Sequence, residues 1–270
     1  MIRIIHTLGG CGGTLLSRCI GVLPGVALLS ELNPNAVKLF PAFDPLYQDR
    51  TWLRLLGEAR ADHFSKKDLG RVENFRELVE AFHDCALAAS RRLVIRDYNY
   101  IDFVGVPFIE DPPRRPTLYT ALPNSVPTAS IVFVRHPIDQ WLSLCKHAPV
   151  RDVLKPAAFC EAYAAFLRTL GPGKIYKYED FVRNPDTELW AICNDLSIPF
   201  QASFIEKFHH FDCVTGDMTR LRDETISVPA RKALLPALLE EFRSSQNFEY
   251  ILQATGYAGT IVSCRSMAAG

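Results

Sequence analysis

The 270-residue sequence lacks an apolar run long enough to cross a membrane, an excess of charge of either sign, and any closely spaced cysteine pair. Its 30 Lys and Arg residues balance 30 Asp and Glu residues, so the bulk field does not suit a protein that coats nucleic acid or an acidic membrane. The 8 cysteines form no C-x-x-C pair, and no structural zinc site or thioredoxin-type motif is indicated. We therefore expect no metal site, no nucleic-acid partner and no membrane insertion.

Several of the scattered cysteines fall within apolar segments, where a free thiol packs as a small hydrophobe. A strand is predicted to begin at Ile2, which leaves no room for a cleavable signal. These features favour a reducing compartment, and we expect a cytoplasmic protein. The length suits one large domain, predicted over residues 1–258, with a flexible tail of small and polar residues over 259–270.

Short apolar segments alternate with longer segments of helical periodicity, a pattern typical of parallel strands joined by helical crossovers. The fold class predicted is α/β, with three layers: a central, mostly parallel sheet and helices on both faces. We expect a helical insertion over about residues 33–90, and an irregular proline-rich loop over 109–127 with one helical turn near Leu118. The predicted strands are Ile2–His6, Val26–Leu29, Leu93–Ile95, Ile131–Val134 and Lys174–Tyr176.

The first predicted strand leads into the turn Thr7–Thr14, which contains four glycines and precedes a helix. Backbone amides in such a turn can surround an anion, and the helix N-terminus adds partial positive charge. A flexible glycine-rich connector is the alternative. A Walker A loop needs a lysine where Gly13 stands, which makes an ATP or GTP hydrolase less expected.

Two further motifs follow later strands. Arg135-His-Pro at the end of the fourth predicted strand is followed by Ser143, and it resembles the 3′-phosphate-binding motif of sulfotransferases that use 3′-phosphoadenosine 5′-phosphosulfate. An arginine there offers a fork of donors to a phosphate, and Ser143 lies about two helical turns further on. The segment Tyr178-Glu-Asp after the fifth strand resembles the part of the family in which a tyrosine lies against the adenine.

The resemblance covers roughly residues 1–200 and is to the bacterial and carbohydrate-type members, which have a P-loop-like fold. It implies a sulfotransferase that moves a sulfuryl group from this co-substrate to a hydroxyl or amine of a small-molecule or carbohydrate acceptor, without a metal. A homodimer is compatible with it. The residues implied in binding the nucleotide are Gly10, Cys11, Gly12, Gly13, Thr14, Leu15, Arg135, Ser143 and Tyr178.

One departure from the family concerns the cation beside the leaving phosphate. The family usually has Lys or Arg where this chain has Gly10, so activity needs another cation. Arg96, at the end of the third predicted strand, is the best substitute, because sites of α/β proteins collect at such ends. Arg18 is a weaker choice, since its side chain is expected to face solvent. The alternative for Arg96 is a salt bridge to Asp97 or Asp102.

A base must take the acceptor proton as the new bond forms. Glu31, just after the second predicted strand, is the first choice, and Asp97 the second; a helix-capping or surface carboxylate is the alternative for Glu31. Tyr98 occupies the place of a family histidine, while His6 and His136 are weaker candidates. The segment Thr215–Arg220 is expected to close over the nucleotide.

Two other functions stay open at this point. One is a P-loop kinase of a small metabolite, against which the missing Walker lysine and the Arg135–Ser143 pair argue. The other is a catalytically impaired, nucleotide-binding homologue, which Gly10 keeps open.

Overall fold

The computed structural model describes residues 1–170, 173–216, 224–228 and 234–258, and the statements below concern those residues. The tail predicted over 259–270 lies outside them.

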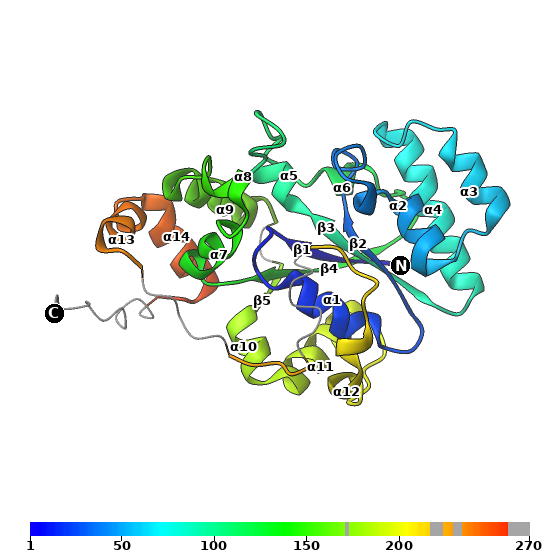
Figure 1. The fold of residues 1–270 in the computed structure, drawn as a ribbon. Coiled ribbons are helices and arrows are strands. Elements are labelled where there is room, and N and C mark those ends of the chain that lie inside the picture. Colours follow the sequence, from blue (N-terminus) through cyan, green and yellow to red (C-terminus); the bar gives the residue numbers. More distant parts are fainter. Residues whose placement is uncertain (171–172, 217–223, 229–233, 259–270) are drawn as a thin grey trace.

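Five parallel strands form one sheet in the order β2-β3-β1-β4-β5, which confirms the predicted α/β fold (Figure 1). Every residue of β1 and β2 is buried, as expected for strands covered on both faces. All five predicted strands are present, each longer than predicted by one to four residues, and the sheet is wholly rather than mostly parallel. The strands are β1 Ile2–Thr7, β2 Val26–Leu32, β3 Arg92–Tyr98, β4 Thr128–Val134 and β5 Lys174–Lys177.

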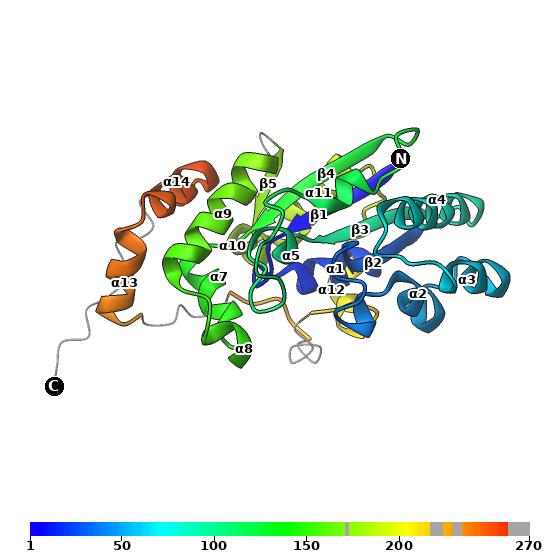
Figure 2. The same ribbon diagram turned by 90° about the horizontal axis from the view of Figure 1, so that it is seen from above.

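Alternate residues of the strands enter two different layers of the core. Ile5 and Ile131 pack with the helices of one face: α1 (Gly13–Gly21), α10 (Tyr178–Arg183), α11 (Pro185–Leu196) and α12 (Phe204–Lys207). Ile4 packs on the other face beneath α4 (Val72–Ala88), and Val132 beneath α9 (Pro156–Leu170). Figure 2 shows the resulting layers from above. The other helices beside α9 are α5 (Asn99–Phe103), α7 (Pro137–Leu144), α13 (Pro236–Arg243) and α14 (Gln246–Thr255).

The region in which a helical insertion is predicted lies between β2 and β3, and it does contain helices. It contains η1 (Pro41–Phe43), α2 (Pro45–Gln48), the π-helical turn η2 (Asp49–Leu53) and α3 (Glu58–Ser65) before α4. In the proline-rich loop, the single predicted helical turn is α6 (Thr117–Thr120). The remaining short helices are α8 (Ala148–Arg151) and η3 (Phe208–His210).

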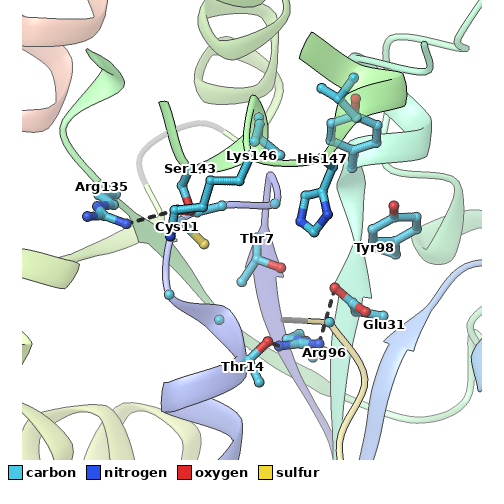
Figure 3. A pocket seen from close by; sticks show the side chains of 18 of the residues that line it. Thr7, Cys11, Thr14, Glu31, Arg96, Tyr98, Arg135, Ser143, Lys146 and His147 are labelled. Atoms are coloured by element: carbon cyan, nitrogen blue, oxygen red, sulfur yellow. Dashed lines mark hydrogen bonds and ion pairs between the residues drawn. The ribbon is translucent and has the colours of Figure 1, made fainter. Parts of the chain in front are cut away.

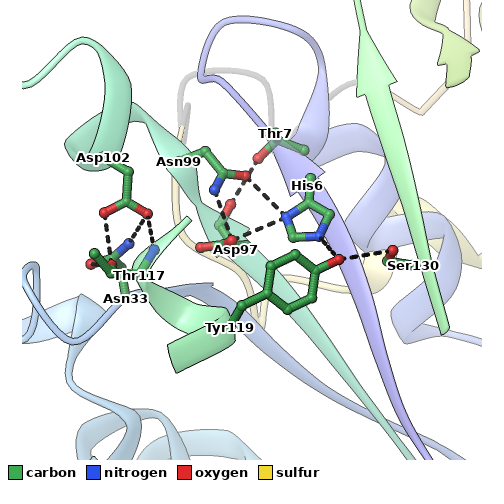
Figure 4. Close-up of polar contacts among 9 residues, drawn as sticks. All are labelled: His6, Thr7, Asn33, Asp97, Asn99, Asp102, Thr117, Tyr119 and Ser130. Atoms are coloured by element: carbon green, nitrogen blue, oxygen red, sulfur yellow. Dashed lines mark hydrogen bonds and ion pairs between the residues drawn. The ribbon is translucent and has the colours of Figure 1, made fainter. Parts of the chain in front are cut away.

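A buried polar network joins the proline-rich loop to the ends of β1 and β3 (Figure 4). Asp97 Oδ2 accepts from Asn99 Nδ2 at 2.8 Å and lies 3.1 Å from His6 Nδ1. The other ring nitrogen of His6 lies 2.9 Å from the Tyr119 hydroxyl, which donates to Ser130 Oγ. The network therefore fixes the loop against the sheet.

Asp102 is the centre of an adjoining cluster. Its carboxylate accepts from Asn33 Nδ2 at 2.9 Å, and from the Thr117 backbone amide and hydroxyl at 2.8 and 2.7 Å. Burial raises the pKa of Asp102 to about 7, the nearby Asp97 adds to the rise, and the three hydrogen bonds oppose it.

This raised pKa predicts a pH dependence of stability. An unfolded aspartate titrates near pH 4, so the folded state binds the proton more tightly than the unfolded state does. The contribution of Asp102 to the free energy of unfolding should therefore fall as the pH rises from about 4 to about 7, by at most about 1.4 kcal/mol per pH unit. Above about pH 7 this contribution should no longer change with pH. Urea unfolding of wild type and Asp102→Asn from pH 5 to pH 8 measures this. Equal slopes for the two proteins would contradict it, and Asp111→Asn, an exposed carboxylate of the same loop, is the control.

Candidate functional site

The turn between β1 and α1 owes its shape to glycine. Gly9, Gly10 and Gly12 have φ of 75°, 66° and 93°, values that L side chains rarely adopt. A Cβ on Gly12 would lie 2.3 Å from the ring of Tyr178, and a Cβ on Gly10 would lie 2.9 Å from the backbone oxygen of Gln140. The turn is therefore packed between α10 and α7 with no space for side chains at these two positions.

This turn forms one wall of a cavity of about 720 Å³ at the carboxyl ends of the strands, where α/β proteins bind ligands. The structure brings together in this cavity all nine residues predicted for nucleotide binding. They are Gly10, Cys11, Gly12, Gly13, Thr14, Leu15, Arg135, Ser143 and Tyr178.

Arg135 lies directly after β4 and faces the turn (Figure 3). Its guanidinium carbon is 4.6 Å from the centroid of the Tyr178 ring, and its Nη1 donates to the Gly10 carbonyl at 3.4 Å. Its Nε is buried and has no hydrogen-bond partner among the described residues. A partly buried guanidinium with an unused donor, next to glycine amides, suits a phosphate.

Arg96 and Glu31 form an ion pair at the other side of the cavity, with Nη2 and Oε1 3.2 Å apart. Arg96 is 1% exposed and donates to the Thr14 hydroxyl at 3.3 Å and to the Thr215 carbonyl at 2.8 Å. The alternative salt bridge of Arg96 to Asp97 or Asp102 is wrong, because its acidic partner is Glu31.

The position of Glu31 follows from an irregularity in β2. The register between β2 and β3 shifts between Leu29 and Leu32, and Glu31 has a left-handed φ of 55°. The bulge directs the carboxylate into the cavity instead of leaving it at the surface or at a helix cap. Oε2 is buried without a partner among the described residues, while Arg96 holds Oε1.

Three other predicted candidates are held by contacts with other parts of the protein. Asp97 belongs to the His6 network and is not among the residues that line the cavity, because alternation along β3 turns it away from the side of Arg96 and Tyr98. His136 is buried and stacks edge-on to the ring of Tyr257. The expectation that Arg18 faces solvent is wrong: it is 3% exposed, lines the cavity, and donates to the backbone carbonyls of His209 and Phe211.

The segment predicted to close over the nucleotide is described only at its start. The Thr215 amide donates to Ser30 Oγ at 3.1 Å, and its carbonyl accepts from the Thr14 hydroxyl at 3.2 Å. A Cβ on Gly216 would lie 2.4 Å from Thr14 Oγ1. Residues 215–216 therefore touch the glycine turn, while 217–220 lie outside the described residues.

An aromatic wall lines one side of the cavity, and sequence reasoning missed three of its members, Phe40, Phe43 and Phe108. The rings of Phe43 and Tyr98 are tilted against each other with centroids 4.8 Å apart, and the Phe40 ring lies 4.9 Å from that of Phe43 and 5.0 Å from that of Phe108. Tyr100 lies beside Tyr98, and all five rings line the cavity. They come from three separate segments, and no motif links them.

Lys146 and His147, in the turn between α7 and α8, also line the cavity and were also missed. They follow Ser143 by three and four positions, so one face of a helix and its end would bring all three together. That spacing was a usable signal in the sequence. Among the described residues there is no group of three or more His, Cys, Asp or Glu side chains that could hold a metal ion. No helix in the described part of the chain is long and apolar enough to span a bilayer.

No protein-family model and no curated protein matches the chain. Among solved structures, it is similar to the sulfotransferase domain of the olefin synthase of Synechococcus PCC 7002, with 19% identity, a TM-score of 0.61, and coverage of 95% of this chain and 93% of that one. It is also similar to the sulfotransferase domain from the curacin biosynthetic pathway, with 16% identity, a TM-score of 0.58, and coverage of 94% and 97%. The protein has a sulfotransferase-like fold, and the predicted resemblance is confirmed at that level.

The packing of Tyr178 on the glycine turn predicts that Gly12→Ala destabilises the protein by about 1–3 kcal/mol, since the methyl group meets the ring and the φ is strained. Gly57→Ala is a matched control, because Gly57 has φ 73° and nothing within 4 Å of an added Cβ. Urea unfolding should show a clearly larger loss for Gly12→Ala. Equal losses would mean that backbone strain alone, and not the contact with Tyr178, restricts this position.

Proposed function

We propose that the protein transfers the sulfuryl group of 3′-phosphoadenosine 5′-phosphosulfate to a hydroxyl or amine of a small-molecule acceptor. The observation that supports this most is that the nine nucleotide-binding residues expected from the sequence line one cavity. The fold of the chain agrees with it.

In this proposal the two ends of the nucleotide bind at different parts of the cavity. The amides of Gly12, Gly13 and Thr14 hold the 5′-phosphosulfate, helped by the N-terminus of α1, while the Thr14 hydroxyl donates to the Thr215 carbonyl. Arg135 and Ser143 hold the 3′-phosphate, and the free Nε of Arg135 supplies a donor. Tyr178, beneath the guanidinium, packs against the nucleotide.

The bound co-substrate supplies an activated sulfuryl group whose S–O bond to the 5′-phosphate breaks as a new S–O bond to the acceptor forms. Glu31 takes the proton from the acceptor on Oε2, the oxygen with no other partner. Arg96 orients Glu31 through Oε1 and reaches Thr14 of the turn, so it links the base to the donor side. The remaining rate acceleration comes from positioning the reactants and from stabilising charge in the transition state, as in phosphoryl transfer. Asp97 has no part in the step.

The aromatic wall indicates which chemical class of acceptor the cavity favours. Its rings lie on the side of the cavity near Tyr98 and Glu31, and the Tyr100 hydroxyl is already used in a hydrogen bond to the Val106 carbonyl. A carbohydrate needs many hydrogen-bonding partners, whereas an acceptor with an apolar body gains from burial against rings. We therefore favour an apolar or aromatic small molecule over a carbohydrate.

Two other functions have less support. A P-loop kinase would need a lysine where Gly13 stands, and a Cβ there would already lie 3.1 Å from Thr7 Cγ2. A nucleotide-binding homologue without turnover would bind the same nucleotide and transfer nothing, so the binding and turnover measurements below distinguish it.

Nucleotide preference tests the donor site. Adenosine 3′,5′-bisphosphate should raise the melting temperature by several degrees, and more than ATP with magnesium or AMP at equal concentration. Arg135→Met should remove most of that difference, because the charge-assisted contacts to the 3′-phosphate are lost. A larger shift with ATP and magnesium would favour the kinase.

The base is tested by Glu31→Gln. The amide oxygen can still accept from Arg96, so the affinity for the bisphosphate should stay within about twofold, while turnover with a phenolic acceptor falls about a hundredfold or more. Turnover is followed by the mass gain of the acceptor. Glu58→Gln, at an exposed position of α3, is the control and should behave as wild type. Full turnover of Glu31→Gln would exclude Glu31 as the base.

A further inference from the structure

The backbone of Ser30 pairs with a side chain instead of a second strand. In the described part of the chain β2 is an edge strand of the sheet, and α2 lies beside it (Figure 1). The Ser30 amide donates to Oε1 of Gln48, the last residue of α2, at 2.8 Å, and Gln48 Nε2 donates to the Ser30 carbonyl at 2.6 Å. Both residues are fully buried. The Gln48 side chain therefore makes the two hydrogen bonds that a neighbouring strand or water would otherwise make.

This pairing lies at the bulge that directs Glu31 into the cavity. Ser30 precedes Glu31, whose φ of 55° is a conformation that such a side chain keeps only where its surroundings enforce it. The Ser30 hydroxyl is held as well, because it accepts from the Thr215 amide at 3.1 Å. Arg96 holds the Glu31 carboxylate itself. The residue before Glu31 is thus fixed through its backbone by Gln48 and through its hydroxyl by Thr215.

The same amide group reaches the aromatic wall. Gln48 Nε2 also donates to the Ala42 carbonyl, at 2.9 Å. Ala42 belongs to η1 and stands in the chain between Phe40 and Phe43, two residues of the wall. The Phe43 backbone amide donates to the Phe40 carbonyl at 3.0 Å, so both rings depend on the conformation of this turn. One planar group with two hydrogens on its nitrogen therefore links the bulge at Ser30 to the wall.

We propose that Gln48 is a positioning residue that couples the acceptor side of the cavity to the base. It keeps Glu31 directed at the acceptor hydroxyl or amine, and it holds Phe40 and Phe43 against the apolar body of the acceptor. This inference rests on the proposed function and deepens it. Gln48 is fully buried and is not among the residues that line the cavity, so it acts through its neighbours and not by touching a substrate.

The kinetics of Gln48→Met test this role, because methionine has a similar length and no amide. With a phenolic acceptor, kcat should fall about tenfold or more as Glu31 loses its fixed direction, and KM for the acceptor should rise about threefold or more as the wall loosens. The affinity for adenosine 3′,5′-bisphosphate, measured by calorimetry, should stay within about twofold of wild type, since the glycine turn and Arg135 keep their contacts.

A neighbouring buried residue provides the matched control. Asp49 is 3% exposed, and its Oδ1 accepts from the backbone amides of Leu55 and Leu56, so Asp49→Ala also removes buried hydrogen bonds from a side chain to the backbone. It should lower the melting temperature and leave kcat and KM as in wild type. Losses of kcat and KM equal to those of Gln48→Met would mean that any disturbance of this region suffices, and the specific role of Gln48 would be overturned.

A second variant covers the case in which Gln48→Met does not fold. Gln48→Asn keeps a polar amide but is shorter by one methylene, so it cannot reach both the Ser30 and the Ala42 carbonyl. It should show losses of kcat and KM in the same direction, again with the bisphosphate affinity retained.

A double-mutant cycle with Glu31→Gln shows whether Gln48 acts through the base. If it does, Gln48→Met should lower kcat by less than about twofold in the Glu31→Gln background, where no base remains to be positioned. It should still raise KM there, because the wall depends on Gln48 in either background. Losses of kcat that simply multiply would overturn the coupling to Glu31.

The outcomes for the two proposals differ. A wild-type protein that binds the bisphosphate no better than AMP, or that transfers no sulfuryl group, overturns the proposed function and this inference with it. A wild-type protein that prefers the bisphosphate and turns over, combined with a Gln48→Met variant that keeps its kcat and KM, overturns the role of Gln48 alone.

Discussion

The close packing of the β1–α1 turn is the constraint on which the rest of the site depends. Where Gly10 and Gly12 stand, a single methyl group would meet α7 or Tyr178, so both helices approach the backbone directly. That approach brings Arg135 over Tyr178 and within reach of the Gly10 carbonyl. It also sets the position of Ser143 and of the turn after α7 relative to β1. The bare backbone of the turn thus orders the elements around it.

The charges of the cavity are divided between two sides. On the side of β2 and β3, Arg96 and Glu31 neutralise each other in a buried pair, and the pair is tied to Thr14 and Thr215 by hydrogen bonds. On the side of β4 and α7, two cations, Arg135 and Lys146, line the cavity together with one carboxylate, that of Asp139. A polyanionic ligand is therefore attracted mainly to the second side, while the first holds a carboxylate in a fixed orientation.

The sheet and the phosphate-binding residues could be predicted because both depend on local sequence. Buried parallel strands such as Ile2–Thr7 are short apolar runs, and the glycine turn and Arg135 follow strands directly. The partner of Arg96 could not be predicted, since it depends on a register shift within β2 that turns Glu31 toward the cavity. The prediction that Asp97 acts as a base failed for a related reason. The sequence does not tell which face of β3 an acidic residue occupies. The aromatic wall joins residues that are distant in the chain, and only the folded structure brings them together.

Three of the five rings of the wall belong to a different part of the fold from the glycine turn. The turn, Arg135 and Arg96 sit on strand ends whose backbone is fixed by the sheet, whereas Phe40, Phe43 and Phe108 come from connections outside it. Connections tolerate substitution and changes of length better than strand ends do. Mutations can therefore accumulate in the wall and reshape that half of the cavity during evolution, while the half built on the strands stays the same.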